Sequence, residues 1–107
     1  MNTLCGDGIL SGITATAHGF YGPQGRRLRA ELSTDIATSL AEWKYDTLRI
    51  TSFEMETSAL YGLSKTLGHR ACTICAIIAN RSQGVFSSDY QSIVDQLIEY
   101  VLNKLTT

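Results

Sequence analysis

The stretch that decides the expected fold is Thr51-Ser52-Phe53-Glu54-Met55-Glu56-Thr57-Ser58-Ala59-Leu60. Thr51 and Glu54 have the spacing of a capping box, in which the two side chains satisfy free amides at the start of a helix. The apolar residues that follow recur on one helical face, at Met55, Ala59, Leu60, Leu63 and Leu67. The stretch therefore predicts a loop, a cap and an amphipathic helix.

Two carboxylates, Glu54 and Glu56, flank Met55 at this predicted junction. Inside a regular helix they would lie about 200° apart, so they converge on one ligand only where the backbone is not yet regular. The exposed N–H groups and the dipole of a helix N-terminus tolerate negative charge at such a place. On composition alone the simpler interpretation is structural: Glu54 caps the helix, Glu56 is a solvated acid and Met55 belongs to the core.

The elements expected around this stretch alternate between strand and helix, which indicates an α/β fold. They are a strand within Ile9–Ala17, an amphipathic helix over Glu31–Lys44, a short strand at Tyr45–Ile50, a buried strand over Ala71–Ala79 and a last helix with its apolar stripe from Ile93 to Leu105. Ser88 and Gln91 have the spacing of a second capping box, before this last helix.

Composition narrows the class of protein. The chain has 107 residues, a net charge of -1, 44% hydrophobic residues and 18% charged residues, which is typical of one globular domain. This charge balance gives no general attraction to nucleic acid or to an anionic membrane, so neither partner is expected. There is no apolar run long enough to span a membrane and no signal-peptide pattern, and we therefore expect a cytoplasmic protein.

The three cysteines are an odd number, which favours reduced thiols. Cys72 and Cys75 have the spacing of a redox or metal motif, but they lie in the run predicted to be a strand. Residues three apart in a strand point to opposite faces, so these thiols should neither pair nor share a metal. No metal site is expected.

A second informative stretch is the loop from His18 to Arg27. Gly22-Pro23 should turn the chain, and an extended backbone after it would project Gln24 and Arg26 to the same side. A glutamine amide offers a donor and an acceptor while an arginine offers donors, so the pair can read a carbonyl–imide–carbonyl edge. The alternative is a solvated basic turn.

The two stretches together resemble the nucleoside phosphorylase/nucleosidase superfamily, and particularly its uridine phosphorylase branch. Phe53-Glu54-Met55-Glu56-Thr57-Ser58-Ala59 resembles the Phe/Tyr-Glu-Met-Glu-Ser/Thr-Ala signature, and Phe20-Tyr21 with Gln24-Gly25-Arg26 resembles the Phe-Tyr and Gln-x-Arg pattern of that branch. The resemblance implies that Glu54 and Glu56 bind ribose hydroxyls and that Met55 packs against the sugar. It also implies that Gln24 and Arg26 contact the pyrimidine and that Phe20 is its aromatic wall.

Ile78-Ala79-Asn80-Arg81 bears on the branch. Purine phosphorylases and nucleosidases of the superfamily have an aspartate where this chain has Asn80, whereas the segment is similar to the Ile-Val-Asn-Arg of the pyrimidine branch. The resemblance implies that Ile78 lies near the base and that Arg81 joins Arg26 in stabilising the departing uracil. A purine nucleoside phosphorylase or nucleosidase is the alternative within the superfamily.

The activity implied by the resemblance is reversible phosphorolysis of uridine to uracil and ribose 1-phosphate, with phosphate as co-substrate, no other cofactor and a homo-oligomeric complete enzyme. The resemblance covers only the C-terminal half of a family member. Residues 1–107 are thus expected to be the C-terminal part of a single domain, in which helices flank a central mixed sheet and the N-terminal half is absent. Gly6 to Gly12 does not make a convincing phosphate loop, so we expect no phosphate-binding residue in this chain and no turnover by it alone.

Two functions of other classes stay open on the sequence. A non-catalytic nucleoside-binding domain would bind uridine without consuming it. A protein-interaction module would use its last helix as a partner surface and would be indifferent to changes at Gln24 or Glu56.

Overall fold

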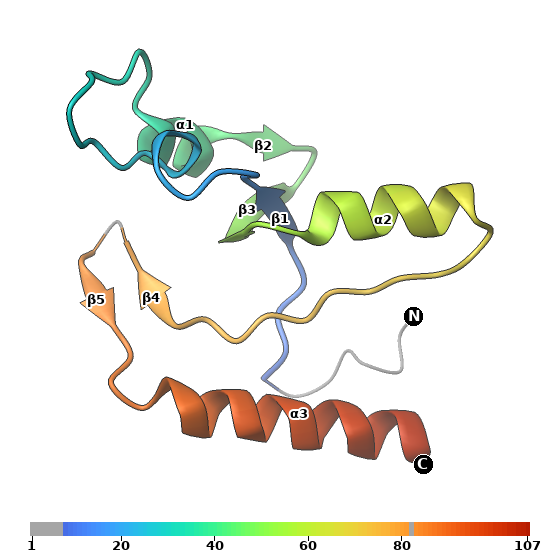
Figure 1. Cartoon of the computed structure of the whole chain (residues 1–107). Coiled ribbons are helices and arrows are strands. Elements are labelled where there is room, and N and C mark those ends of the chain that lie inside the picture. The colour runs from blue at the N-terminus through green and yellow to red at the C-terminus, as the bar shows by residue number, and fades with distance from the viewer. Residues whose placement is uncertain (1–7, 82) are drawn as a thin grey trace. The chain divides into compact units, whose positions relative to one another are not determined.

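The computed structural model describes residues 8–81 and 83–107, which form a mixed α/β structure of short strands and three α-helices (Figure 1). In chain order the elements are β1 (Ile13–Thr16), the 3-10 helix η2 (Gly22–Gln24), α1 (Ile36–Glu42), β2 (Lys44–Tyr45), β3 (Leu48–Glu54), α2 (Thr57–Thr66), β4 (Ala79–Asn80), β5 (Val85–Phe86) and α3 (Tyr90–Thr106). They divide into two compact units, one of residues 12–74 and one of residues 75–107 with the described residues 8–11. The expected α/β class is confirmed.

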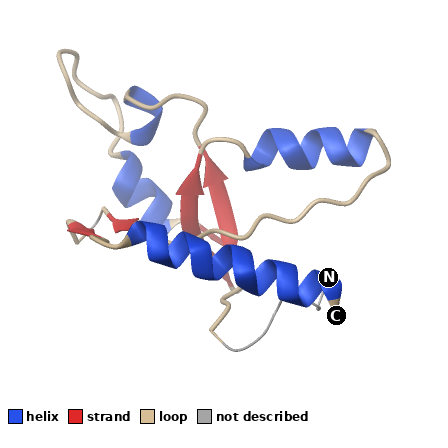
Figure 2. Ribbon diagram, turned by 60° about the horizontal axis from the view of Figure 1, so that its bottom comes forward, coloured by secondary structure: helices blue, strands red, loops and turns tan. Residues whose placement is uncertain are grey.

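The first unit is built on a three-stranded mixed sheet in the order β1-β3-β2. Its central strand β3 pairs in parallel with β1, as the two adjacent arrows in Figure 2 show, and antiparallel with β2. The parallel register sets Thr14 opposite Ser52 and Thr16 opposite Glu54. Helix α2 packs on β1 and helix α1 packs on β3.

Helix α1 is shorter than the predicted Glu31–Lys44. It begins after Asp35, whose carboxylate accepts hydrogen bonds from the amide and the hydroxyl of Thr38 at 3.3 and 2.8 Å. Trp43 has an extended backbone and ends the helix. The apolar periodicity continued beyond both ends, but the side-chain cap at Asp35 fixed the start of the helix.

The predicted capping box at Thr51 is wrong. Thr51 lies inside β3, which continues to Glu54, and α2 starts only at Thr57 with Glu56 in the N-cap position. The β-branched pair Ile50-Thr51 suits a pleated strand, and the parallel partner β1 gives that strand a ladder to join. The helix is therefore displaced toward the C-terminus from the start that the capping pattern predicted.

The predicted strand over Ala71–Ala79 is also wrong for most of its length. Only Ala79 and Asn80 form a strand, β4, which pairs antiparallel with β5. Since β-propensity reflects packing against neighbouring strands, an apolar run forms no strand where no ladder pairs with it, and none among the described residues pairs with residues 71–78. Strand alternation thus no longer separates Cys72 from Cys75, and both thiols are free and exposed.

The predicted C-terminal helix is confirmed as α3. The second capping box is not formed, because the helix follows Asp89 and the side chain of that residue makes no capping hydrogen bond. No helix in the described part of the chain is long and apolar enough to span a membrane. Cys5 and the beginning of the glycine-punctuated segment 6–12 lie outside the described residues.

Burial is concentrated at one place in the first unit. Among residues 8–81 and 83–107, the two buried residues are Ala17, 7% exposed, and Thr57, 6% exposed. Ala17 follows β1 directly, and its amide donates to the carbonyl of Glu54 at 2.9 Å. Thr57 is the first residue of α2. The best-packed point of the unit is thus where the parallel strands end and α2 begins.

Candidate functional site

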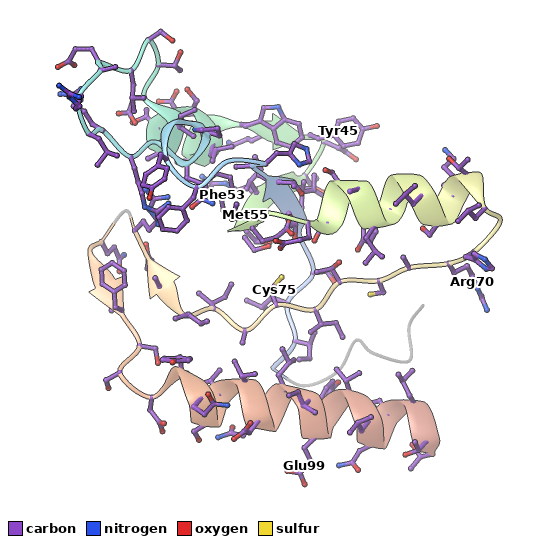
Figure 3. All side chains as sticks on the ribbon, viewed as in Figure 1. Tyr45, Phe53, Met55, Arg70, Cys75 and Glu99 are labelled. Carbon is purple, nitrogen blue, oxygen red and sulfur yellow. The ribbon has the colours of Figure 1, made fainter. Side chains whose placement is uncertain are left out.

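The site is built on the edge where the parallel strands β1 and β3 both end. Thr16 is the last residue of β1, and its register partner Glu54 is the last residue of β3. Carboxyl ends of parallel strands are where α/β folds gather ligand-binding side chains. Met55 and Glu56 follow immediately and lead into α2; Figure 3 shows Met55 at this passage.

The Glu54 carboxylate is the centre of a hydrogen-bond network at this edge. One oxygen, Oε1, accepts from the Thr16 hydroxyl at 2.5 Å. The other, Oε2, accepts from the amides of Glu56 and Thr57 at 2.6 and 2.7 Å. Glu54 therefore caps α2, as the structural interpretation of the sequence predicted. Its carboxylate accepts from the amides of residues that follow it in the chain, and not from the amide of Thr51.

This network changes the acidity of Glu54. Partial burial acts to raise the pKa of the carboxyl, but the hydrogen bonds from the Thr16 hydroxyl and from the Glu56 and Thr57 amides outweigh it. The net result is a pKa of about 2, compared with an ordinary value of 4.5. Glu54 is thus a carboxylate at all physiological pH values.

Glu56 is placed differently from Glu54. Its amide is bonded to the Glu54 carboxylate, while its side chain is exposed. Its backbone, with φ of -128° and ψ of -24°, is not helical, so the residue lies at an irregular junction, as expected for a carboxylate ligand at this place. Glu54 therefore has a structural role at the start of α2, whereas the carboxylate of Glu56 is exposed.

The loop after β1 brings together the three residues expected to contact a base. Arg26 Nη1 donates to Gln24 Oε1 at 2.5 Å and to the Phe20 carbonyl at 2.6 Å. The guanidinium carbon of Arg26 lies 3.8 Å from the centre of the Phe20 ring, a cation–π contact. Phe20, Gln24 and Arg26 form one cluster, which we call the Arg26 cluster.

The backbone that assembles the Arg26 cluster is a tight turn and not the extended segment we expected. Gly22 starts the 3-10 helix η2 with Pro23 as its second residue, and Gly25 ends it in the left-handed region with φ of 77°. The amide of Arg26 returns to the Tyr21 carbonyl at 2.9 Å. The side chains of Gln24 and Arg26 thus meet across a tight turn of the backbone and not along an extended segment.

Two residues that sequence reasoning gave no role also lie at this edge. Thr16 bonds to Glu54 as described, and it also accepts a hydrogen bond from the amide of Ser58 at 3.1 Å. His18 Nε2 lies 3.5 Å from the Ser58 hydroxyl, across the start of α2. No local pattern could identify either contact, since the partners are about 40 positions apart in sequence.

Ile78 and Arg81 belong to the second unit, where both side chains are exposed. The carbonyl of Ile78 accepts from the amide of Ser87 at 2.7 Å, which extends the β4–β5 hairpin. Asn80 accepts from the amide of Gln83 through its side chain at 3.3 Å. The assignment of Ile78 and Arg81 to a base site stays a prediction.

In the part of the chain that the structure describes there is no group of three or more His, Cys, Asp or Glu side chains able to hold a metal.

Comparison with known proteins gives one informative similarity. The chain is 39% identical over 75 residues to a uridine phosphorylase of Thermococcus kodakarensis (strain ATCC BAA-918 / JCM 12380 / KOD1). The aligned region covers 70% of this chain but 27% of the relative, so the chain spans about a quarter of the relative's length. No family model and no solved structure matches the chain. The similarity supports a partial relation to nucleoside phosphorylases, which are pentosyltransferases.

Proposed function

We propose that this chain supplies the base- and ribose-binding part of a uridine phosphorylase, which converts uridine and phosphate reversibly to uracil and ribose 1-phosphate. The observation that carries the proposal is the Arg26 cluster, in which Arg26 contacts both Gln24 and Phe20. The similarity to a uridine phosphorylase over 75 residues supports it. The junction that holds Glu54, Met55 and Glu56 belongs to the same unit.

The Arg26 cluster has the donors and acceptors that a uracil edge requires. The Gln24 carbonyl oxygen accepts from Arg26, but an amide oxygen has a second lone pair that can accept the imide N–H of a base. The Gln24 NH₂ group and the other N–H groups of Arg26 are the donors for the two uracil carbonyls. Phe20 is 50% exposed, so part of its ring is accessible to a pyrimidine.

Glu56 is our candidate for the ribose hydroxyls. A carboxylate that accepts from two vicinal hydroxyls forms charge-assisted hydrogen bonds, which are stronger than those of a neutral amide. Met55, half-buried beside it, would pack against the sugar. Glu54, which the resemblance also implied as a sugar ligand, already accepts from Thr16, Glu56 and Thr57. We assign it mainly to the cap.

The proposed reaction has phosphate as co-substrate and no other cofactor. Phosphate attacks the anomeric carbon while the glycosidic C–N bond breaks, and the bonding electrons leave with uracil. Arg26 would stabilise the charge on the uracil oxygens through preorganised donors. The amides of Glu56, Thr57 and Ser58 are bonded within the chain, so this helix N-terminus does not offer them to phosphate. We propose that the phosphate ligands lie elsewhere in a homo-oligomeric enzyme.

Isothermal titration calorimetry of the chain with uridine and with inosine tests the proposed substrate, because it measures the affinity for each nucleoside. Uridine should bind more tightly, because the Arg26 cluster matches a pyrimidine edge and Asn80 lacks the carboxyl of the purine enzymes. Tighter binding of inosine would move the chain to the purine branch. Binding of neither nucleoside would contradict the proposal.

A further inference from the structure

The Thr16 hydroxyl connects β1 to both sides of the junction that precedes α2. It donates to Glu54 Oε1 at 2.5 Å and accepts from the Ser58 amide at 3.1 Å. Glu54 Oε2 in turn accepts from the amides of Glu56 and Thr57. Three consecutive amides at the start of α2 are thus held by two side chains, one from each parallel strand.

The chemistry of this arrangement makes Thr16 more than a strand residue. A hydroxyl has one donor and can accept at the same time, so Thr16 can serve the carboxylate and the Ser58 amide together. The contact of a hydroxyl with a carboxylate is charge-assisted and is among the stronger hydrogen bonds in proteins. Without it, Glu54 Oε1 would have no partner from β1, and the carboxylate could rotate away from the two amides.

Glu56 is the residue that such a rotation would affect. Its side chain is exposed and starts from a backbone whose amide donates to Glu54 Oε2 at 2.6 Å. We infer that Thr16 is a positioning residue, whose hydroxyl holds the Glu54 carboxylate in the cap and so fixes the backbone from which Glu56 reaches the ribose. The ribose part of this inference rests on the proposed function.

A matched control is available on the same strand. Thr14 has the same side chain two residues earlier, also partly buried, and its hydroxyl lies 2.7 Å from that of Ser52 instead of bonding to Glu54. Thr14→Val and Thr16→Val therefore remove the same group from the same strand, but only the second change touches the cap. Thr16→Ser keeps the hydroxyl and should behave as the unmodified chain does.

The first readout is the pKa of Glu54, followed by carbon-13 NMR of its carboxyl group. In Thr16→Val the pKa should rise from about 2 toward 4.5, because the hydrogen bond from Thr16 is one cause of its depression. Thr16→Ser and Thr14→Val should leave it low. An unchanged Glu54 pKa in Thr16→Val would overturn the inference.

The second readout separates the sugar from the base, by titrating each variant with uridine and with uracil. Thr16→Val should weaken uridine about tenfold, the scale of one hydrogen bond to a charged group, and leave uracil unchanged. Equal losses for both ligands would show a general structural role and overturn the inference. If the unmodified chain binds neither ligand, the proposed function and the ribose part fall together, and the Glu54 pKa alone decides whether Thr16 holds the cap.

A measurement on the unmodified chain covers the case in which Thr16→Val does not fold. The amides of Glu56, Thr57 and Ser58 should shift together in nitrogen-15 spectra as the pH passes through the Glu54 pKa. Ser58 is informative because its amide bonds to Thr16 and not to Glu54. A Ser58 amide that does not move with the other two would contradict the connection through Thr16.

Discussion

The Glu54 carboxylate and the Thr57 amide lie 2.7 Å apart, which makes Glu54 the cap of a helix that starts three residues later. Glu56, two residues on, leaves its carboxylate exposed. Two acids that look equivalent in the sequence are therefore distinguished by the structure: one holds the junction and the other faces solvent beside it.

Glu54→Gln should destabilise the unit of residues 12–74 and remove the loss of stability that accompanies protonation of Glu54 at low pH. The folded-state pKa of Glu54, about 2, is lower than its ordinary value of 4.5, so its contribution to stability is complete above pH 4.5 and is lost as the pH falls toward 2. At pH 7 the loss of the charged cap should cost about 1 kcal/mol. Thermal melting followed by circular dichroism at pH 7 and pH 3 measures both effects. A variant that melts like the unmodified chain at pH 7 would contradict the capping role.

Glu56→Gln should do the opposite, because the backbone amide of this residue and not its carboxylate belongs to the cap. We expect an unchanged melting temperature and an affinity for uridine that falls toward that for 2′-deoxyuridine, since a charged acceptor for two hydroxyls becomes a neutral one. Titration of both nucleosides with both chains gives the ratio. A lower melting temperature with an unchanged ribose-to-deoxyribose ratio would make Glu56 a structural acid.

Arg26→Ala should weaken uracil binding far more than Arg29→Ala does. Arg26 contacts Gln24 and Phe20, whereas Arg29 is exposed, so the two variants remove the same charge from different surroundings. Losing a hydrogen bond to a charged group costs about 1.5–3 kcal/mol, or about 10–150-fold in affinity. Competition titrations with uracil measure this, and equal small losses in both variants would reject the base site.

Gly25→Ala should loosen the Arg26 cluster through the backbone. With φ of 77° the position is left-handed, where an alanine costs about 1–2 kcal/mol, although the added methyl group would meet Ile36 only at an ordinary 3.5 Å. Gly22→Ala, at the start of the same turn, is the control because its added methyl group would face open space and its φ is outside that region. We expect weaker uracil binding for Gly25→Ala alone; a matching loss in Gly22→Ala would show that the turn is merely sensitive to any substitution.

The sequence predicted those parts of the fold that local chemistry determines. The Gly22-Pro23 turn and the broad stripe of α3 were identified because turn formers and helical periodicity act within a few residues. Gln24 and Arg26 were expected to meet through an extended backbone, but they meet through a 3-10 turn, and Phe20 was joined to them only by the family resemblance.

The incorrect predictions, and the role of Thr16 that no pattern predicted, have their cause in tertiary structure. Thr51 matched a capping pattern, but it lies in β3, which pairs with β1 in the sheet. Residues 71–78 have strand composition but no partner strand among the described residues. Thr16 carried no local signal, because its role depends on a partner 38 positions away that the parallel register brings opposite it.

The proposed base and ribose site is tested most directly by a titration of nitrogen-15-labelled chain with uridine, followed through the side-chain N–H signals of Gln24 and Arg26 and the amide of Glu56. Uridine should shift all three sets of signals, uracil should shift only those of Gln24 and Arg26, and the side-chain signals of Arg29 should stay unchanged. Signals of Gln24 and Arg26 that do not respond to uridine, or that respond equally to inosine, would contradict the proposed site.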